Sequence, residues 1–163
     1  MDGTTKVLAV LFVTWLVTVP VGCLAHELAH AFAIWRRTGR RSFVTVGRET
    51  PLLEVRMSFC DLHFHPLVEE AWCWFDSRGT TVDQARSIAR AGSLADAVMM
   101  LCLAAIAYAV GDPESVWFWI AAVGFVLCGA SSIFELIPIN RPGQVSDGGY
   151  MMGLRGRRGD EPA

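Results

Sequence analysis

Charged residues are almost absent from three long stretches of this 163-residue chain. Val7 to Ala25 has no charged side chain, Ala91 to Val110 has only Asp96, and Val116 to Ile137 has only Glu135. Each stretch is long enough to cross a hydrocarbon core of about 30 Å. Hydrophobic residues make up 53% of the chain and the mean hydropathy is +0.39, which excludes an ordinary soluble domain. The sequence therefore predicts a membrane α-helical protein with transmembrane helices at about 7–35, 82–110 and 116–137.

Basic residues are absent between the second and third predicted helices, and of the 14 Lys and Arg only Lys6 precedes the first. Positive charge stays on the cytoplasmic side of a membrane. We therefore expect an integral membrane protein of a bacterial-type cell membrane, with its amino terminus outside and loop 36–81 and tail 150–163 inside. A cleaved signal peptide is the competing interpretation of the first helix, but the apolar pattern runs on past Cys23, which favours an uncleaved span.

The sequence also lacks closely spaced cysteine pairs and the features typical of nucleic-acid binding. Its five cysteines show no CxxC spacing, so we interpret them as structural thiols. The net charge is −2, and the arginines are explained by topology, so we expect no nucleic-acid partner.

One motif with chemical meaning lies inside the first apolar stretch: His26-Glu27-Leu28-Ala29-His30. Residues four apart share a helix face, so both imidazoles can bind one Zn²⁺ while Glu27 stands beside it as a base. Hydrogen-bonded core histidines are the alternative. That alternative would bury three ionisable groups on one turn without a partner, which is costly at membrane depth.

Catalytic zinc needs a third protein ligand and leaves its fourth position to water. Three carboxylates are candidates, namely Asp96 in the second helix, Glu135 at the end of the third, and Asp147 just beyond it. The residue types alone leave the choice open.

With these segments together, the chain resembles the site-2 protease family of intramembrane zinc metalloproteases, in a minimal three-helix form. The resemblance lies in HExxH at 26–30, Ala-Gly-Ser-Leu-Ala-Asp at 91–96, Glu-Leu-Ile-Pro at 135–138 and Asp-Gly at 147–148. It implies that Asp147, in a loop spanning 138–149, is the third zinc ligand, with one zinc per chain.

Three departures from the family pattern stand out. Glu135 takes the place of the family Asn, the stretch from Pro138 to Asp147 is longer, and the second-helix pattern has Ser93 and Asp96. The family Asn helps to hold substrate near the metal. The resemblance therefore assigns substrate positioning to Glu135 or to the nearby Asn140.

The loop between the first two helices changes from helical to alternating periodicity. Ser42 to Gly47 and Leu52 to Phe59 are predicted strands around a turn at Thr50-Pro51, giving a small cytoplasmic β-hairpin or sheet. Asp61, His63 and His65 could form a second metal site, but they lack further ligands nearby, so we favour a structural role.

Together these features predict one integral-membrane domain that hydrolyses a peptide bond within or near a transmembrane segment of a membrane-protein substrate. Zinc activates the attacking water, and Glu27 accepts and returns its proton. An exposed strand edge could hold the unwound substrate. The alternative is a catalytically idle metal-binding scaffold or an adaptor.

Overall fold

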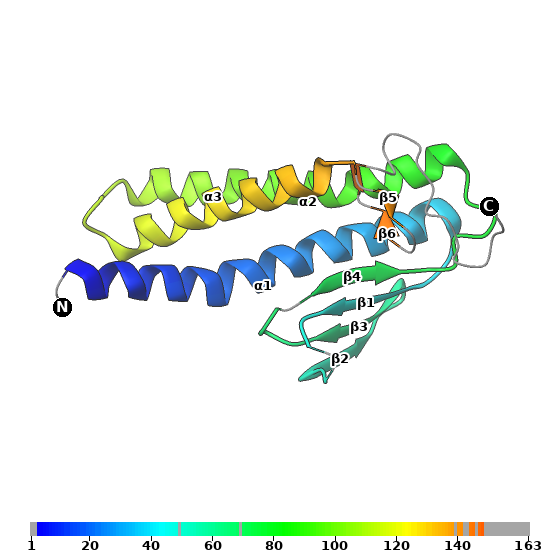
Figure 1. The fold of residues 1–163 in the computed structure, drawn as a ribbon, viewed down its shortest axis with the longest axis horizontal. Coiled ribbons are helices and arrows are strands. Elements are labelled where there is room, and N and C mark those ends of the chain that lie inside the picture. Colours follow the sequence, from blue (N-terminus) through cyan, green and yellow to red (C-terminus); the bar gives the residue numbers. More distant parts are fainter. Residues whose placement is uncertain are drawn as a thin grey trace.

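The structure is a computed structural model that describes residues 3–48, 50–68, 70–138, 140–141, 144–145 and 147–148. Three long helices lie side by side along the molecule (Figure 1): α1 at Gly3–Thr38, α2 at Val82–Val110 and α3 at Val116–Leu136. All three are long and apolar enough to cross a membrane. The predicted helices are therefore confirmed, with α1 a few residues longer at each end.

Local signals in the sequence set the helix boundaries. The Thr81 side chain accepts a hydrogen bond from the Gln84 backbone N–H, and the Gln84 side chain accepts one from the Thr81 N–H, which completes a capping box. Gly39 ends α1 with a φ of 71°, and Gly111 ends α2 with a φ of 61°. Only glycine adopts such backbone angles without a steric cost, so these two glycines determine where α1 and α2 end.

Small side chains bring α1 and α3 close together. Thr14 and Thr18 of α1 are buried, as are Ala121 and Gly124 of α3. A Cβ built on Gly124 would lie 3.0 Å from Thr18 Cγ2. Close backbone approach at small residues is how helices pack where burial from water gives little driving force.

The segment of the chain that joins α1 to α2 forms one sheet of four short strands. They are β1 at Ser42–Val46, β2 at Leu53–Arg56, β3 at Cys60–Phe64 and β4 at Ala71–Trp74. Their order is β2-β3-β1-β4, with β1 parallel to β3 and antiparallel to β4.

The predicted small sheet is confirmed, but the strands predicted at 42–47 and 52–59 do not pair with each other as a hairpin. The hairpin is β2 with β3, and β3 lies between β1 and β2. Its residues alternate as a half-buried strand should, because Cys60 and Leu62 are buried whereas Asp61 and His63 are not. Asp61 and His63 of the suspected metal site thus lie on the outer face of β3, and His65 follows the end of the strand.

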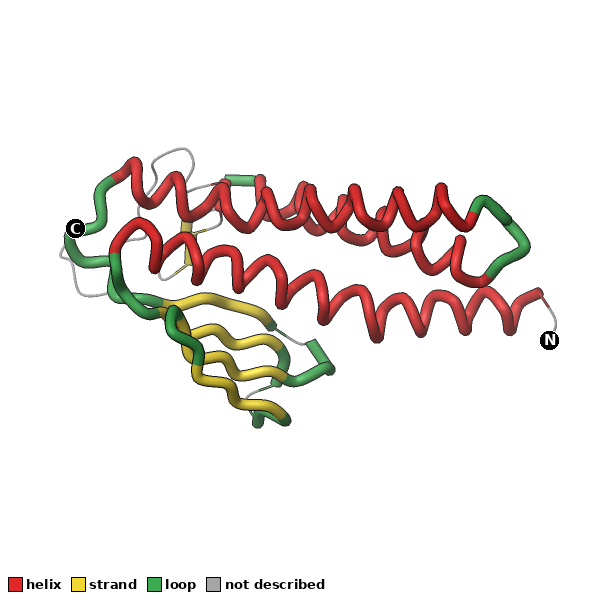
Figure 2. The backbone as a smooth tube through the Cα atoms, turned by 180° about the vertical axis from the view of Figure 1, so that it is seen from behind, coloured by secondary structure: helices red, strands yellow, loops and turns green. Residues whose placement is uncertain are grey.

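The sheet packs on the same turns of α1 that carry the HExxH motif. Ala31 forms one core with Val44 and Val46 of β1 and with Cys60 and Leu62 of β3. The sheet covers one side of α1, and α2 and α3 cover the other (Figures 1 and 2). This portion of α1 is therefore fixed from both sides.

A candidate metal centre between the helices

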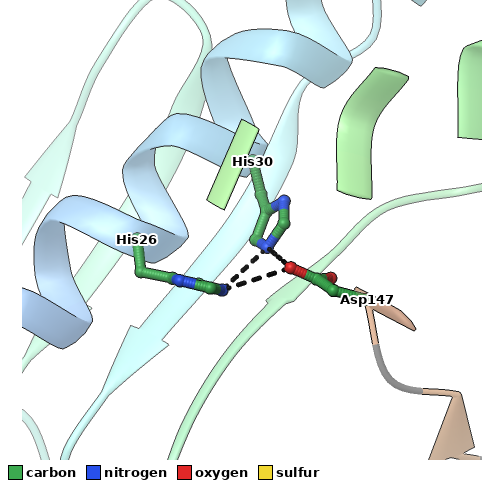
Figure 3. Close-up of side chains that lie close together, drawn as sticks. All are labelled: His26, His30 and Asp147. Carbon is green, nitrogen blue, oxygen red and sulfur yellow. Dashed lines mark hydrogen bonds and ion pairs between the residues drawn. The ribbon is translucent and has the colours of Figure 1, made fainter. Parts of the chain in front are cut away.

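Two histidines and one carboxylate converge between α1 and the segment after α3. His26 and His30 project from α1 toward Asp147 (Figure 3), and the two Nε2 atoms lie 3.0 Å apart. Asp147 Oδ2 lies 3.1 Å from His30 Nε2 and 3.5 Å from His26 Nε2. Among the described residues, this is the group of His, Cys, Asp and Glu side chains whose atoms could hold a metal ion.

The other ring nitrogens settle which tautomer each histidine adopts. His30 Nδ1 lies 2.9 Å from the carbonyl oxygen of Ile88, which can only accept, so Nδ1 carries the hydrogen. His26 Nδ1 lies 3.0 Å from Asp96 Oδ2 and donates to it in the same way. Both Nε2 atoms in the neutral rings then present lone pairs to the same point.

Three lone pairs that face one another without a donor repel, and a cation relieves this. Asp147 Oδ2 is buried and has no hydrogen-bond partner among the described residues. Tetrahedral zinc with ligand bonds of about 2.0 to 2.1 Å would separate its ligand atoms by about 3.3 Å. The observed separations of 3.0, 3.1 and 3.5 Å bracket that value, so the three residues fit a metal ion such as zinc.

Two glycines make this convergence possible. A Cβ on Gly92 of α2 would lie 2.5 Å from His26 Nε2 and would overlap His30 Nε2 as well. A Cβ on Gly148 would overlap the carbonyl oxygen of Leu136. Gly92 therefore lets α2 approach both imidazoles, and Gly148 lets Asp147 fold back against the end of α3.

Ile88, Gly92 and Asp96 explain why α2 fits this site. They are four residues apart and share one face of the helix. On that face the Ile88 carbonyl accepts a hydrogen bond from His30, Gly92 leaves room for both rings, and the Asp96 carboxylate accepts a hydrogen bond from His26.

The remaining predicted site residues take different places. Glu27 is buried and is outside the group that could hold an ion. Asp96 and Glu135, the other two candidates for third ligand, are also outside that group. The Asp96 carboxylate accepts a hydrogen bond from His26 Nδ1, and Glu135 is exposed on α3.

The backbone of Asn140 pairs with Val145, but its side chain lies outside the described residues, as does the tail 150–163.

The histidines of the sheet have other neighbours. The His63 ring packs edge-on against Phe43, and His65 Nδ1 accepts a hydrogen bond from the Leu67 backbone N–H. In the part of the chain that is described, neither belongs to a group that could hold a metal.

Comparison with known proteins leaves the family open, because no protein-family model matches the chain and no curated protein matches it either.

Gly92 belongs to the 91–96 motif but was given no role from the sequence, and the Ile88 carbonyl and Ser132, which contacts Asp96, were not predicted. A glycine inside an apolar helix was the one available signal. Its meaning depends on which helix it faces, and that is a property of the tertiary packing.

Proposed function

We propose that this chain is an intramembrane zinc metalloprotease of the site-2 protease type. The observation that carries the proposal is the convergence of His26 Nε2, His30 Nε2 and Asp147 Oδ2, with Glu27 buried on the same turn of α1. A structural zinc site would be expected to use four protein ligands. Three ligands beside a carboxylate that is not a ligand favour a catalytic centre over an idle scaffold.

His26, His30 and Asp147 would hold the ion. Zinc bound there supplies a Lewis acid that polarises a carbonyl and lowers the pKa of bound water to about 7. Glu27 would accept a proton from the attacking water and return it to the leaving amine. Burial of the surrounding residues excludes bulk water and strengthens the electrostatic interactions among these groups.

The centre would lie near the cytoplasmic boundary of the hydrocarbon core. The 21 residues of α3 extend about 31 Å, close to the thickness of that core. Gly148 packs on Leu136 at the end of α3, so Asp147 is level with that end.

The arginines support this orientation. Arg36 and Arg37 lie in the last turn of α1, and Arg86 and Arg90 lie in the first three turns of α2. Arg37 Nε donates to Ser87 Oγ at 3.0 Å, so the two basic helix ends lie together, beyond His30. By the positive-inside rule this end of the bundle faces the cytoplasm, and the amino terminus faces outside.

The substrate would be a transmembrane segment that unwinds before cleavage. An intact helix hides its peptide groups in its own hydrogen bonds, so the cleaved segment needs other partners. Strand β4 is at one edge of the sheet and contacts α1, the helix that carries both histidines. An unwound segment added to this edge would run beside the metal centre.

The proposal is tested by comparing membrane-protein fragments from cells that carry the intact chain, Glu27→Gln, or the control Glu54→Gln on exposed strand β2. Fragments cut within or near transmembrane segments should accumulate with the intact chain and the control, and disappear with Glu27→Gln. Glu27→Gln should keep its metal, because Glu27 is not a ligand. The same fragments in equal amounts from Glu27→Gln cells would contradict the proposal.

A further inference from the structure

Asp96 is a buried carboxylate in the apolar helix α2, and the reaction proposed above does not use it. Its Oδ2 atom lies 3.0 Å from His26 Nδ1 of α1. The Ser132 Oγ of α3 lies 3.1 Å from the same oxygen and 2.9 Å from the Cys128 carbonyl oxygen, so its one hydrogen is shared between the two acceptors. One carboxylate oxygen thus joins side chains from all three long helices.

The position of Asp96 separates it from the metal ligands. It contacts the nitrogen of His26 that points away from His30 and Asp147, whereas Nε2 faces those two residues. Any effect of Asp96 on a metal ion would therefore pass through the imidazole. Carboxylates in this position fix the ring orientation and tautomer of a ligating histidine and raise its basicity.

The two histidines are supported unequally. His30 Nδ1 donates to a neutral backbone carbonyl, that of Ile88, whereas His26 Nδ1 donates to a charged side chain. Burying a carboxylate in an apolar helix is costly unless it is paired, so a neutral acceptor would have been the cheaper way to orient the ring. The charge needs a further reason, and a dication held by Nε2 on the opposite side of the ring would supply one.

We propose that Asp96 is a positioning residue of the metal centre, which locks His26 in its Nε2-ligand tautomer and adds negative charge that tightens metal binding. Ser132 holds the carboxylate in place. This inference rests on the proposed metal centre and assigns to α2 and α3 a direct part in metal affinity.

The test measures zinc affinity of the full-length chain in detergent by competition with a chromophoric chelator. Asp96→Ala should weaken zinc binding by about 10- to 100-fold. Asp96→Asn should weaken it less, because the amide oxygen still accepts from Nδ1 but the charge is gone, and Ser132→Ala less again. Two exposed residues serve as matched controls, Asp83→Asn on the same helix as Asp96 and Ser131→Ala beside Ser132, and should stay within about twofold of the intact chain.

A second measurement separates positioning from helix packing. The melting temperature of each chain is measured after zinc removal, and Asp96→Asn should melt close to the intact chain. Unchanged zinc affinity in both Asp96 variants would overturn the inference and leave the metal centre standing. Loss of affinity only in proportion to a lower metal-free melting temperature would also overturn it, since Asp96 would then be a packing residue. An intact chain that bound no zinc would refute the proposed function and this inference with it.

Discussion

Replacing Gly92 by alanine is the smallest change that should disable the metal centre. The added methyl group would lie 2.5 Å from His26 Nε2 and would overlap His30 Nε2 too. Ordinary van der Waals contact begins at 3.4 Å, so the His26 ring or helix α2 must retreat by about 0.9 Å. Ligand distances in a metal site tolerate only about 0.2 Å.

The size of the effect on zinc affinity depends on how much of the overlap remains in the metal-free and in the metal-bound state. Without metal, the imidazoles can turn away from the methyl group if they give up their Nδ1 hydrogen bonds to Asp96 and Ile88. With metal bound they cannot turn, so the overpacking cost of about 1–3 kcal/mol falls mainly on the bound state. Gly92→Ala should therefore weaken zinc binding by about 5- to 150-fold while lowering the melting temperature of the metal-free chain less than that of the zinc-bound chain.

The assay is a zinc titration of the purified chain against a competing chelator. Gly22→Ala is the matched control, because among the described residues a Cβ there comes within 4 Å of Cys128 Sγ alone, at 3.8 Å. It should bind zinc like the intact chain. If Gly92→Ala also bound zinc with unchanged affinity, the close approach of α2 to the two imidazoles would be refuted.

Three further predictions concern other parts of the molecule. Gly148→Ala should lower zinc content, because its Cβ would overlap the Leu136 carbonyl and displace Asp147; normal zinc content would contradict this packing. A cysteine at exposed Ser58 should be labelled from the cytoplasmic side and one at exposed Glu114 from outside; the reverse result would invert the topology. Burial raises the pKa of the Cys73 thiol to about 12, so iodoacetamide should modify it slowly at pH 8 until the chain is unfolded; rapid modification of the folded chain would show an accessible thiolate.

The sequence predicted those features that depend on neighbouring residues. The spacing of His26 and His30 is a local pattern and has the predicted geometry, and the capping box from Thr81 to Gln84 is a local pattern of the same kind. The long helices could be predicted for the same reason, since apolar length alone identifies them.

Features that depend on distant residues were missed. Strand β3 is paired with β1 in parallel, and nothing in residues 60–64 alone indicates that partner. Asp96 was considered as a metal ligand, but only the packing of α2 against α1 reveals that it faces Nδ1 of His26 rather than Nε2. The choice of Asp147 came from a resemblance, and its contact with His30 Nε2 depends on the fold of the segment after α3.

Metal content of purified ligand variants tests the central claim most directly. The intact chain should carry about one zinc, and His30→Ala and Asp147→Asn should lose most of it. Glu135→Asn should keep it, because Glu135 is exposed and outside the group that could hold the ion. An empty Glu135→Asn variant beside a filled Asp147→Asn variant would contradict the account, since Glu135 would then be the third ligand.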